Sequence, residues 1–305
     1  MKCKVCGKEA WIKIPSANAA FCEEHFDQYV LRLVERAIKK FKMFEGNETI
    51  VVAVSGGKDS LALLHILKRL GYKPHALHID VGIERSDYSR ISEEKAVKFA
   101  SKLEIPIEVI RVEEIHGLGV IDLAMKRRRI PCQVCGLTRR YYMNKFAQEL
   151  GAPVIATGHT LDDMVAALFA NLLRWDLSYL SKGAPLLPSE DGLIKRAKPL
   201  TFVQDKETLI YSRLHGIDFA SVECPESRFA TFKRYKKLFE SLEEESPGTK
   251  RQFFQGYVKN FRIFDENKPS YELKPCLVCG YPTISKVCSF CRLWFPEKAR
   301  EALQE

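Results

Sequence analysis

The stretch Thr49-Ile-Val-Val-Ala-Val-Ser-Gly-Gly-Lys-Asp-Ser60 decides the fold of this chain. Its first six residues are a continuous apolar, β-branched run, which is typical of a strand buried on both faces of a parallel sheet. The next six form a glycine-containing turn that leads into a helix expected over residues 59–70. Glycines let the backbone turn tightly and approach a ligand closely. The helix N-terminus offers unpaired N–H groups and a positive dipole end, so the turn predicts a pyrophosphate cradle.

This cradle differs from the Walker A loop. Val52 and Asp59 stand where that motif requires glycine and serine or threonine. Within the turn, Ser55 and Ser60 can donate hydroxyl protons, and Lys58 can add a point charge.

Strands and helices are expected to alternate on both sides of this stretch. The apolar patterns predict strands over 75–80, 106–112 and 153–157, and helices over 29–44, 88–103, 136–150 and 160–173. Such alternation predicts right-handed βαβ units in an α/β, doubly wound parallel sheet of Rossmann-like type, with ligands bound at the carboxyl ends of the strands. Residues 205–265 are expected to be mostly helical, with a break at Ser246-Pro247-Gly248.

Composition narrows the class of protein. The chain has 305 residues, of which 46% are hydrophobic and 29% charged, as in ordinary globular proteins. It contains neither the roughly 18 apolar residues that span a bilayer nor an N-terminal secretory signal, so we expect a cytoplasmic protein without a membrane anchor. The net charge of +9 favours a polyanionic partner such as nucleic acid.

Ten cysteines in a reducing compartment indicate metal or redox chemistry rather than disulfides. Eight ligands fall into two sets with the spacing of closed tetrahedral zinc sites, namely Cys3, Cys6, Cys22 and His25, and Cys276, Cys279, Cys288 and Cys291. Structural zinc stabilises modules that are too small to have a core of their own. The alternative is a set of reduced, unliganded thiols.

Cys132, Cys135 and Cys224 remain, and three is the wrong number for a closed zinc site. Three thiolates can hold an iron–sulfur cluster and leave one iron open to an exogenous ligand. A persulfide with a resolving cysteine is a second interpretation, and buried inert thiols are a third.

The SGGxDS pattern of Ser55–Ser60 resembles the signature of the PP-loop ATP pyrophosphatases, also described as adenine nucleotide alpha hydrolase-like. That family cleaves ATP between the α and β phosphates and transfers AMP. The resemblance implies adenine contacts from His78-Ile79-Asp80. Gly158-His-Thr-Leu-Asp-Asp163 resembles a second signature of the family, whose acids can hold Mg²⁺. The alternative for Asp162 and Asp163 is helix capping, which we place second.

The resemblance assigns nucleotide contacts to Ala53, Val54, Ser55, Gly56, Gly57, Lys58, Asp59, Ser60, His78, Ile79, Gly158 and Asp163. It assigns catalytic roles to Lys58, Asp59, Asp162, Cys132, Cys135 and Cys224. Magnesium is expected near Asp59 together with Asp162 or Asp163.

Together, the loop and the three cysteine sets resemble the tRNA 2-thiouridine synthetases of the TtuA type. The resemblance implies a 4Fe–4S cluster on the cysteine triad, two Zn²⁺ ions and a homodimer. It also implies a ubiquitin-like thiocarboxylate protein as sulfur carrier. The expected reaction adenylates the C2 oxygen of 5-methyluridine 54 in tRNA and replaces it with sulfur.

Three alternatives stay open. They are thiolation of the wobble uridine 34, a PP-loop ligase that acts on another substrate, and a non-catalytic RNA-binding protein. The expected organisation is a zinc module over 1–27, a PP-loop domain over 28–220, a helical extension over 221–268 with the third cluster cysteine, and a second zinc module over 269–305.

A basic run, Lys126–Arg129, directly precedes Cys132, and Arg139-Arg140 follow closely. Such runs are usually solvated faces. Beside a reaction centre, we favour contact with tRNA phosphates or with the ATP tail. Aromatic rings that could stack on splayed bases are expected instead to pack in the core. They are Tyr141, Tyr142 and Trp175.

Overall fold

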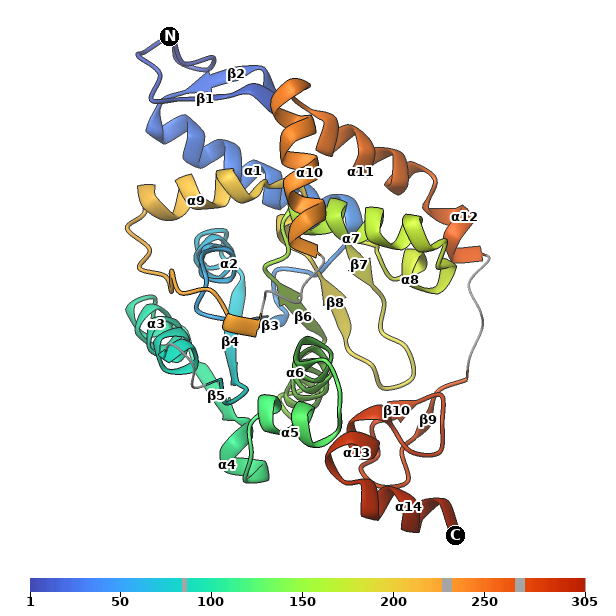
Figure 1. The fold of residues 1–305 in the computed structure, drawn as a ribbon. Helices are drawn as coiled ribbons and strands as arrows, with labels where there is room; N and C mark the ends of the chain where they lie inside the picture. Colours follow the sequence, from blue (N-terminus) through green and yellow to red (C-terminus); the bar gives the residue numbers. More distant parts are fainter. Residues whose placement is uncertain (84–86, 227–231, 267–271, 305) are drawn as a thin grey trace.

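The computed structural model describes residues 1–83, 87–226, 232–266 and 272–304. A six-stranded sheet in the order β5-β4-β3-β6-β8-β7 forms the centre of the chain (Figure 1). Five strands run parallel: β3 (Thr49–Ala53), β4 (Lys73–Asp80), β5 (Ile107–Arg111), β6 (Val154–Thr157) and β8 (Lys195–Ala197). The predicted parallel sheet is confirmed. The sequence analysis missed β8 and the antiparallel edge strand β7 (Leu186–Leu187), which are too short to show a period.

Helices cover both faces of this sheet, as a doubly wound fold requires. Alternate residues of β3 point to opposite sides, so Ile50 and Val52 lie in one apolar cluster and Val51 in another. The first cluster is built with α1 (Glu23–Phe41), α2 (Lys58–Arg69), α3 (Tyr88–Lys102), α7 (Leu161–Arg174) and α9 (Asp205–Leu214). The second is built with α4 (Val112–His116), α5 (Val120–Lys126), α6 (Pro131–Glu149) and the C-terminal module.

The predicted core helices lie within a few residues of the observed ones, with two exceptions at their first residues. Helix α1 begins at Glu23, six residues before the expected start. Helix α6 begins at Pro131, five residues before the expected Gly136. Proline suits the first helical position because its fixed φ matches the helix and its missing N–H is not needed there. Cys132 and Cys135 therefore lie on the first turns of α6.

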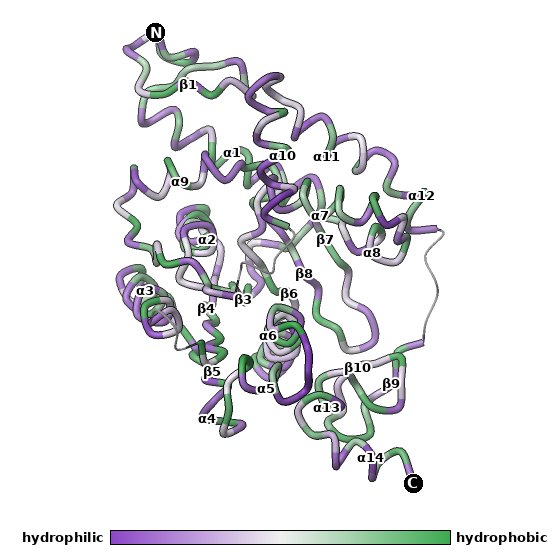
Figure 2. Tube along the Cα trace, in the orientation of Figure 1, coloured by the Kyte–Doolittle hydropathy of each residue, from purple (hydrophilic) through white to green (hydrophobic). Residues whose placement is uncertain are grey.

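A helical arm follows the core and comprises α10 (Phe232–Glu245), α11 (Thr249–Lys259) and α12 (Phe261–Glu266), with α10 and α11 packed on α7. The break at residues 246–248 occurs where it was predicted. Figure 2 shows that α10 carries many hydrophilic residues. The short helix α8 (Leu177–Ser181) and the 3-10 turns at Pro15–Ala17 and Pro199–Phe202 complete the core elements.

Two small cysteine-containing modules lie at opposite ends of the molecule (Figure 1). The N-terminal module is a hairpin of β1 (Ile12–Ile14) and β2 (Ala19–Phe21) that leads into α1. The C-terminal module contains β9 (Lys274–Pro275), β10 (Pro282–Thr283), α13 (Ser289–Trp294) and α14 (Pro296–Gln304). The expected boundary between residues 268 and 269 lies outside the described residues. None of the described helices is both long and apolar enough to span a membrane.

Candidate active site

The loop between β3 and α2 is held in shape by its own serines. The backbone N–H of Ser55 donates to Oγ of Ser60 at 3.1 Å, and that hydroxyl donates to the carbonyl of Gly57 at 3.0 Å. Gly56 has a φ of +76°, and a Cβ there would lie 2.2 Å from the carbonyl oxygen of Ser92. The loop therefore needs glycine at this position both for its conformation and for space.

The two charged residues of the loop pair with each other beneath α9. Nζ of Lys58 lies 2.6 Å from Oδ1 of Asp59 and 3.1 Å from Oγ1 of Thr208. The Thr208 hydroxyl also donates to Asp59. Burial raises the pKa of Asp59 above its ordinary value, and the charge of Lys58 opposes that rise. The pair places a cation and a carboxylate at the carboxyl end of β3, beside the predicted phosphate cradle.

The second motif packs directly against the first. A Cβ on Gly158 would lie 2.9 Å from both the N and Cα atoms of Ser60, so only glycine allows the turn after β6 to approach α2 this closely. Thr160 and Asp163 form a reciprocal capping box at the start of α7. The structure thus shows for Asp163 the capping role that the sequence analysis placed second.

Asp162 is held entirely by protein donors. Its Oδ2 accepts from the backbone N–H of Asp205 at 2.8 Å, and its Oδ1 lies 2.5 Å from Nζ of the buried Lys250. Because both oxygens are used, this geometry favours a role in fixing α9 and α11 to α7 over direct magnesium ligation. The magnesium role of Asp162 stays a prediction that this arrangement does not favour.

The sequence analysis missed the cations that approach this site from later elements. Lys236 of α10 contacts Asp163 and Asp205, and Lys198, directly after β8, is half-buried. Burial lowers the pKa of Lys198 to about 8, and the nearby charge of Arg196 adds to that effect. No local motif marks these residues, because they are brought together only by the order of the strands and by the packing of the arm.

The expected adenine-contacting segment lies at the end of β4. His78 is buried, and its Nδ1 lies 2.8 Å from the carbonyl oxygen of Val54 on the neighbouring strand. The imidazole therefore donates to that carbonyl and ties β4 to the start of the phosphate loop. Burial lowers the pKa of His78, which keeps the ring neutral. The adenine contacts of His78 and Ile79, and the nucleotide contacts of Ala53 and Val54, stay predictions.

The three remaining cysteines lie near enough to influence one another's charge, although their sulfurs do not all lie within 4.8 Å of one another as the ligand atoms of each terminal set do. Burial raises the pKa of Cys132, and the neighbouring Cys135 and Cys224 raise it further. Arg139, one turn beyond Cys135, interacts with the sulfurs of Cys135 and Cys224. Its Nε is buried and has no hydrogen-bond partner among the described residues. Three neighbouring thiols beside an unsatisfied guanidinium nitrogen suit an anionic group larger than a single metal ion, such as an iron–sulfur cluster held by thiolates.

Each terminal cysteine set converges on one point. In both sets, the four ligand atoms lie within 4.8 Å of one another, so each set could hold a metal ion. In the N-terminal set, Sγ of Cys22 lies 3.1 Å from Nδ1 of His25 on the first turn of α1. Gly7 and Gly280 close the first knuckle of each set with φ near +71° and +72°. Four nitrogen and sulfur donors in this arrangement suit structural zinc.

In the basic run Lys126–Arg129, one side chain makes a structural contact and the other three are exposed. Nε of Arg127 donates to the carbonyl of Leu293 in the C-terminal module at 3.0 Å, whereas Lys126, Arg128 and Arg129 are exposed. In Figure 2, the loop between α5 and α6 is strongly hydrophilic.

The prediction that three aromatic side chains pack in the core was right for two of them and wrong for the third. Tyr141 and Tyr142 are buried as expected. The expectation that Trp175 packs in the core was wrong, because its side chain is 75% exposed. It ends α7 in a left-handed conformation, after which the chain turns into α8.

Comparison with known proteins identifies the family. Residues 30–228 match the PP-loop domain family, and residues 2–27 match the family described as 2-thiouridine synthetase TtuA, N-terminal LIM domain. A tRNA-5-methyluridine(54) 2-sulfurtransferase from Pyrococcus horikoshii is 44% identical over 96% of this chain and 94% of its own. The chain belongs to the PP-loop family of tRNA 2-sulfurtransferases.

Further tRNA-5-methyluridine(54) 2-sulfurtransferases are similar across nearly their full length. The Thermus thermophilus protein is 41% identical over 96% of this chain and 91% of its own. The Thermotoga maritima protein is 42% identical over 96% of both chains.

A solved 2-sulfurtransferase relative shares the whole fold. The U34-tRNA thiolase NcsA from Methanococcus maripaludis, solved with its [4Fe-4S] cluster, superposes with a TM-score of 0.83. It is 25% identical and covers 96% of this chain and 95% of its own. The presence of a cluster in that 2-sulfurtransferase is consistent with the cysteine triad seen here.

Proposed function

We propose that this chain uses ATP to replace the C2 oxygen of 5-methyluridine 54 in tRNA with sulfur. The observation that carries the proposal is the identity of 41–44% over 96% of the chain to three tRNA-5-methyluridine(54) 2-sulfurtransferases. The likeness to a U34-tRNA thiolase keeps the wobble uridine as a second candidate. An unrelated PP-loop ligase is disfavoured because such an enzyme has no need of the cysteine triad.

The phosphate loop supports the first half of this reaction. ATP would bind with its phosphates on Ser55–Ser60, where the first N–H groups of α2 and Lys58 face the negative charge. The uridine C2 oxygen attacks the α-phosphorus, the bond to the β-phosphate breaks, and pyrophosphate leaves. Preorganised donors stabilise the charge that develops during this transfer. Mg²⁺ would be held at this end of the sheet by Asp59 with Asp163, where it would replace the ammonium groups of Lys58 and Lys236 that pair with these two carboxylates.

The cysteine triad supports the second half. A [4Fe–4S] cluster held by Cys132, Cys135 and Cys224 would leave one iron free for a sulfide. Sulfur attacks the adenylated C2, the C2–O bond breaks, and AMP leaves with the original oxygen. Arg139 would hold its guanidinium against the negative charge of the thiolates. A persulfide on one of the same cysteines is the competing source of sulfur.

The remaining assignments belong to the same proposal. The two terminal sets would hold structural Zn²⁺. We expect a homodimer in the cytoplasm and a ubiquitin-like thiocarboxylate protein as the sulfur carrier. These partners rest on the family alone.

One experiment tests the site and the chemistry together. The protein is purified anaerobically, reconstituted with iron and sulfide, and compared with its Cys224→Ala variant by visible absorption and iron content. We expect the parent to show iron–sulfur absorption and the variant to lose it while keeping the same melting temperature. Thiolation by an iron-free protein would contradict the cluster and support persulfide chemistry.

The modified nucleoside is then identified by mass spectrometry with two tRNA transcripts, one lacking uridine 54 and one lacking uridine 34. Loss of thiolation in the first transcript alone supports position 54. Loss in the second alone transfers the assignment to the wobble uridine.

A further inference from the structure

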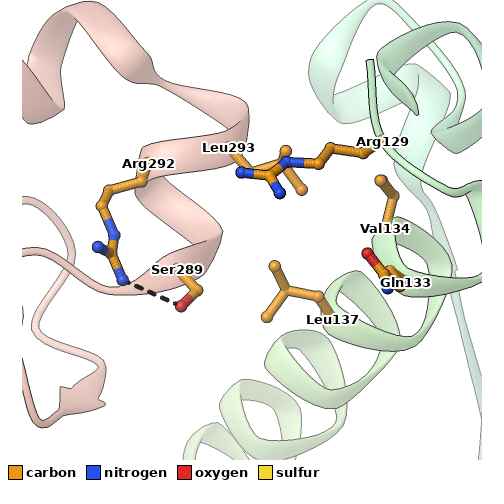
Figure 3. Close-up of a pocket in the computed structure, with 7 residues that line it drawn as sticks. All are labelled: Arg129, Gln133, Val134, Leu137, Ser289, Arg292 and Leu293. Atoms are coloured by element: carbon orange, nitrogen blue, oxygen red, sulfur yellow. Dashed lines mark hydrogen bonds between the residues drawn. The ribbon is translucent and has the colours of Figure 1, made fainter. Parts of the chain in front are cut away.

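A cleft separates the start of α6 from the C-terminal module (Figure 3). It is lined by Arg129, Gln133, Val134, Leu137, Ser289, Arg292 and Leu293 and has a volume of about 360 Å³. That volume is within the range of small-ligand pockets. The cleft shares the first turns of α6 with two cysteines of the triad, since Gln133 and Val134 line it and lie between Cys132 and Cys135 in the chain.

The charged side chains that line this cleft are both positive. Arg129 and Arg292 enter it from opposite walls, and none of the seven described residues that line it is acidic. No carboxylate among the described residues forms an ion pair with either guanidinium. The Arg292 guanidinium donates to Oγ of Ser289 in its own helix, at 3.3 Å. Figure 3 shows Arg129 reaching across toward Leu293, whereas the guanidinium of Arg292 lies beside Ser289. Two guanidiniums on the walls of one cleft, without a carboxylate partner among the described residues, suit an anion.

The floor between the two arginines is apolar. Val134 is buried, and Leu137 and Leu293 are partly buried where the two walls meet. A ligand that fills this cleft therefore offers negative charge to the guanidiniums and a flat or apolar face to the leucines. A nucleotide has both features, because its phosphate is anionic and its base and ribose can lie on side chains.

The walls of the cleft are fixed in place by contacts around it. Arg127 bonds to the carbonyl of Leu293, and Nε1 of Trp294 donates to Oγ1 of Thr138 at 3.0 Å. These contacts join α13 to α5 and α6 on either side of the opening. Because both walls are anchored, the cleft itself is formed before a ligand arrives, and binding has only the two exposed arginine side chains to order.

We propose that this cleft binds a phosphodiester and its nucleotide from the substrate tRNA, next to the nucleotide that enters the active site. The inference rests on the proposed function. A peptide tail of a carrier protein brings one terminal negative charge. The positive surface, in contrast, continues beyond the cleft into the exposed Lys126 and Arg128. Successive cations suit a chain of phosphates better than a single carboxylate.

The test is binding of a tRNA transcript to the full-length, metal-replete protein, measured by fluorescence anisotropy at several salt concentrations. We expect Arg129→Ala and Arg292→Ala each to weaken binding roughly tenfold to a hundredfold, as for a lost charged hydrogen bond. In the double variant, the slope of log K against log salt should fall by about 0.7–0.9, the value for one phosphate contact. Arg292→Lys should keep most of the slope, because lysine retains the charge.

Arg300→Ala is the matched control, since it removes an exposed arginine of the same module from outside the cleft. Cleft variants that change affinity no more than this control would overturn the inference. The inference is also overturned if they bind tRNA like the parent and lose affinity only for a thiocarboxylated carrier. Thiolation is assayed in parallel: a parent that binds tRNA through the cleft but makes no thionucleoside refutes the proposed function and leaves the cleft standing.

Discussion

Lys236 lies with its Nζ 2.5 Å from Oδ1 of Asp163 and thereby joins helix α10 to the first turn of α7. The same ammonium is 2.9 Å from Oδ2 of Asp205 at the start of α9. Burial alone would lower the pKa of Lys236, but the two carboxylates raise it above its ordinary value. The lysine therefore stays charged and neutralises two acids that lie beside the phosphate loop.

Replacing Lys236 by methionine should weaken ATP binding. The variant leaves the carboxylates of Asp163 and Asp205 without their shared cation, so they repel the phosphates of ATP. We expect the KM for ATP, measured by pyrophosphate release, to rise roughly tenfold. The free energy of unfolding should fall by about 1–3 kcal/mol, less than for a fully buried pair because Lys236 is partly exposed.

Lys237→Met is the matched control, because the adjacent lysine is exposed on the same helix. It should change neither the KM nor the stability appreciably. A Lys236→Met protein with the KM of the parent would show that the ion pair only anchors the arm.

The loop glycines should differ sharply in their tolerance of alanine. In Gly56→Ala, the new methyl would stand 2.2 Å from a backbone oxygen at a positive φ, and in Gly158→Ala it would stand 2.9 Å from the backbone of Ser60. Neither obstacle is a flexible side chain. We therefore expect each variant to lose on the order of 4 kcal/mol or more, measured by denaturant unfolding, or to fail to fold.

Gly57→Ala is the comparison for stability. Its φ is negative, and its nearest obstacle is the hydroxyl of Ser55 at 3.5 Å, an ordinary contact. It should unfold within about 1 kcal/mol of the parent. Equal losses at Gly56 and Gly57 would contradict the geometry described for the loop.

The features that were predicted correctly from the sequence are those specified by residues close together in the chain. The buried run before Ser55 and the glycines after it specify strand, turn and helix without help from distant residues. The cysteine spacing likewise predicted two sets of four ligand atoms, which the structure brings within 4.8 Å in each set. Knuckles and short turns are determined by neighbours in the chain, so a pattern of a few residues is sufficient to find them.

Tertiary packing accounts for what the sequence missed. Strands β7 and β8 are two and three residues long and are stabilised by pairing with β6 and with each other, so no period reveals them. Lys236 and Lys250 lie more than 70 residues beyond Asp163 and Asp162, the acids of α7 that they neutralise. Only the docking of the arm onto α7 brings these charges together, and a charged helix gives no sign of which lysine turns inward.

The C-terminal cysteine set should stabilise helix α6, which carries Cys132 and Cys135. Tyr141 of α6 stacks on Phe290 at 3.6 Å between ring centroids, and Phe290 lies between Cys288 and Cys291. Cys288→Ser should lower bound zinc from two ions to one and the melting temperature by at least several degrees, because the module loses the metal that closes it. Elemental analysis and calorimetry measure both.

Ser289→Ala, in the same module but outside the ligand set, should leave both values unchanged. A Cys288→Ser protein that melts like the parent would show that packing alone holds the module on α6.

The cluster of His65 and its neighbours should make stability depend on pH. Burial lowers the pKa of His65 to about 4, and the nearby charges of His215 and Arg69 act in the same direction. Its Nδ1 accepts from the hydroxyl of Tyr211 at 3.0 Å, which requires the neutral ring. Lys102 also lowers the pKa of His65, whereas the carboxylate of Asp27 opposes these effects and raises it.

The direction in which stability changes with pH follows from the lowered pKa of His65. In the unfolded chain, the ring takes up a proton near pH 6.5, whereas in the folded protein it does so only near pH 4. The unfolded state therefore binds more protons between these values, and stability is lost as the pH falls from about 6.5 to 4. For a partly exposed ring, we expect a loss of about 1–3 kcal/mol.

The measurement compares the parent with His65→Gln by urea unfolding between pH 4 and pH 7.5. Glutamine can still accept from Tyr211 but does not titrate, so its stability should fall less on acidification. Acids and metal ligands shared by the two proteins cancel in the difference between the curves. Because the difference isolates one ring, parallel curves across this window would mean that His65 titrates normally in the folded protein.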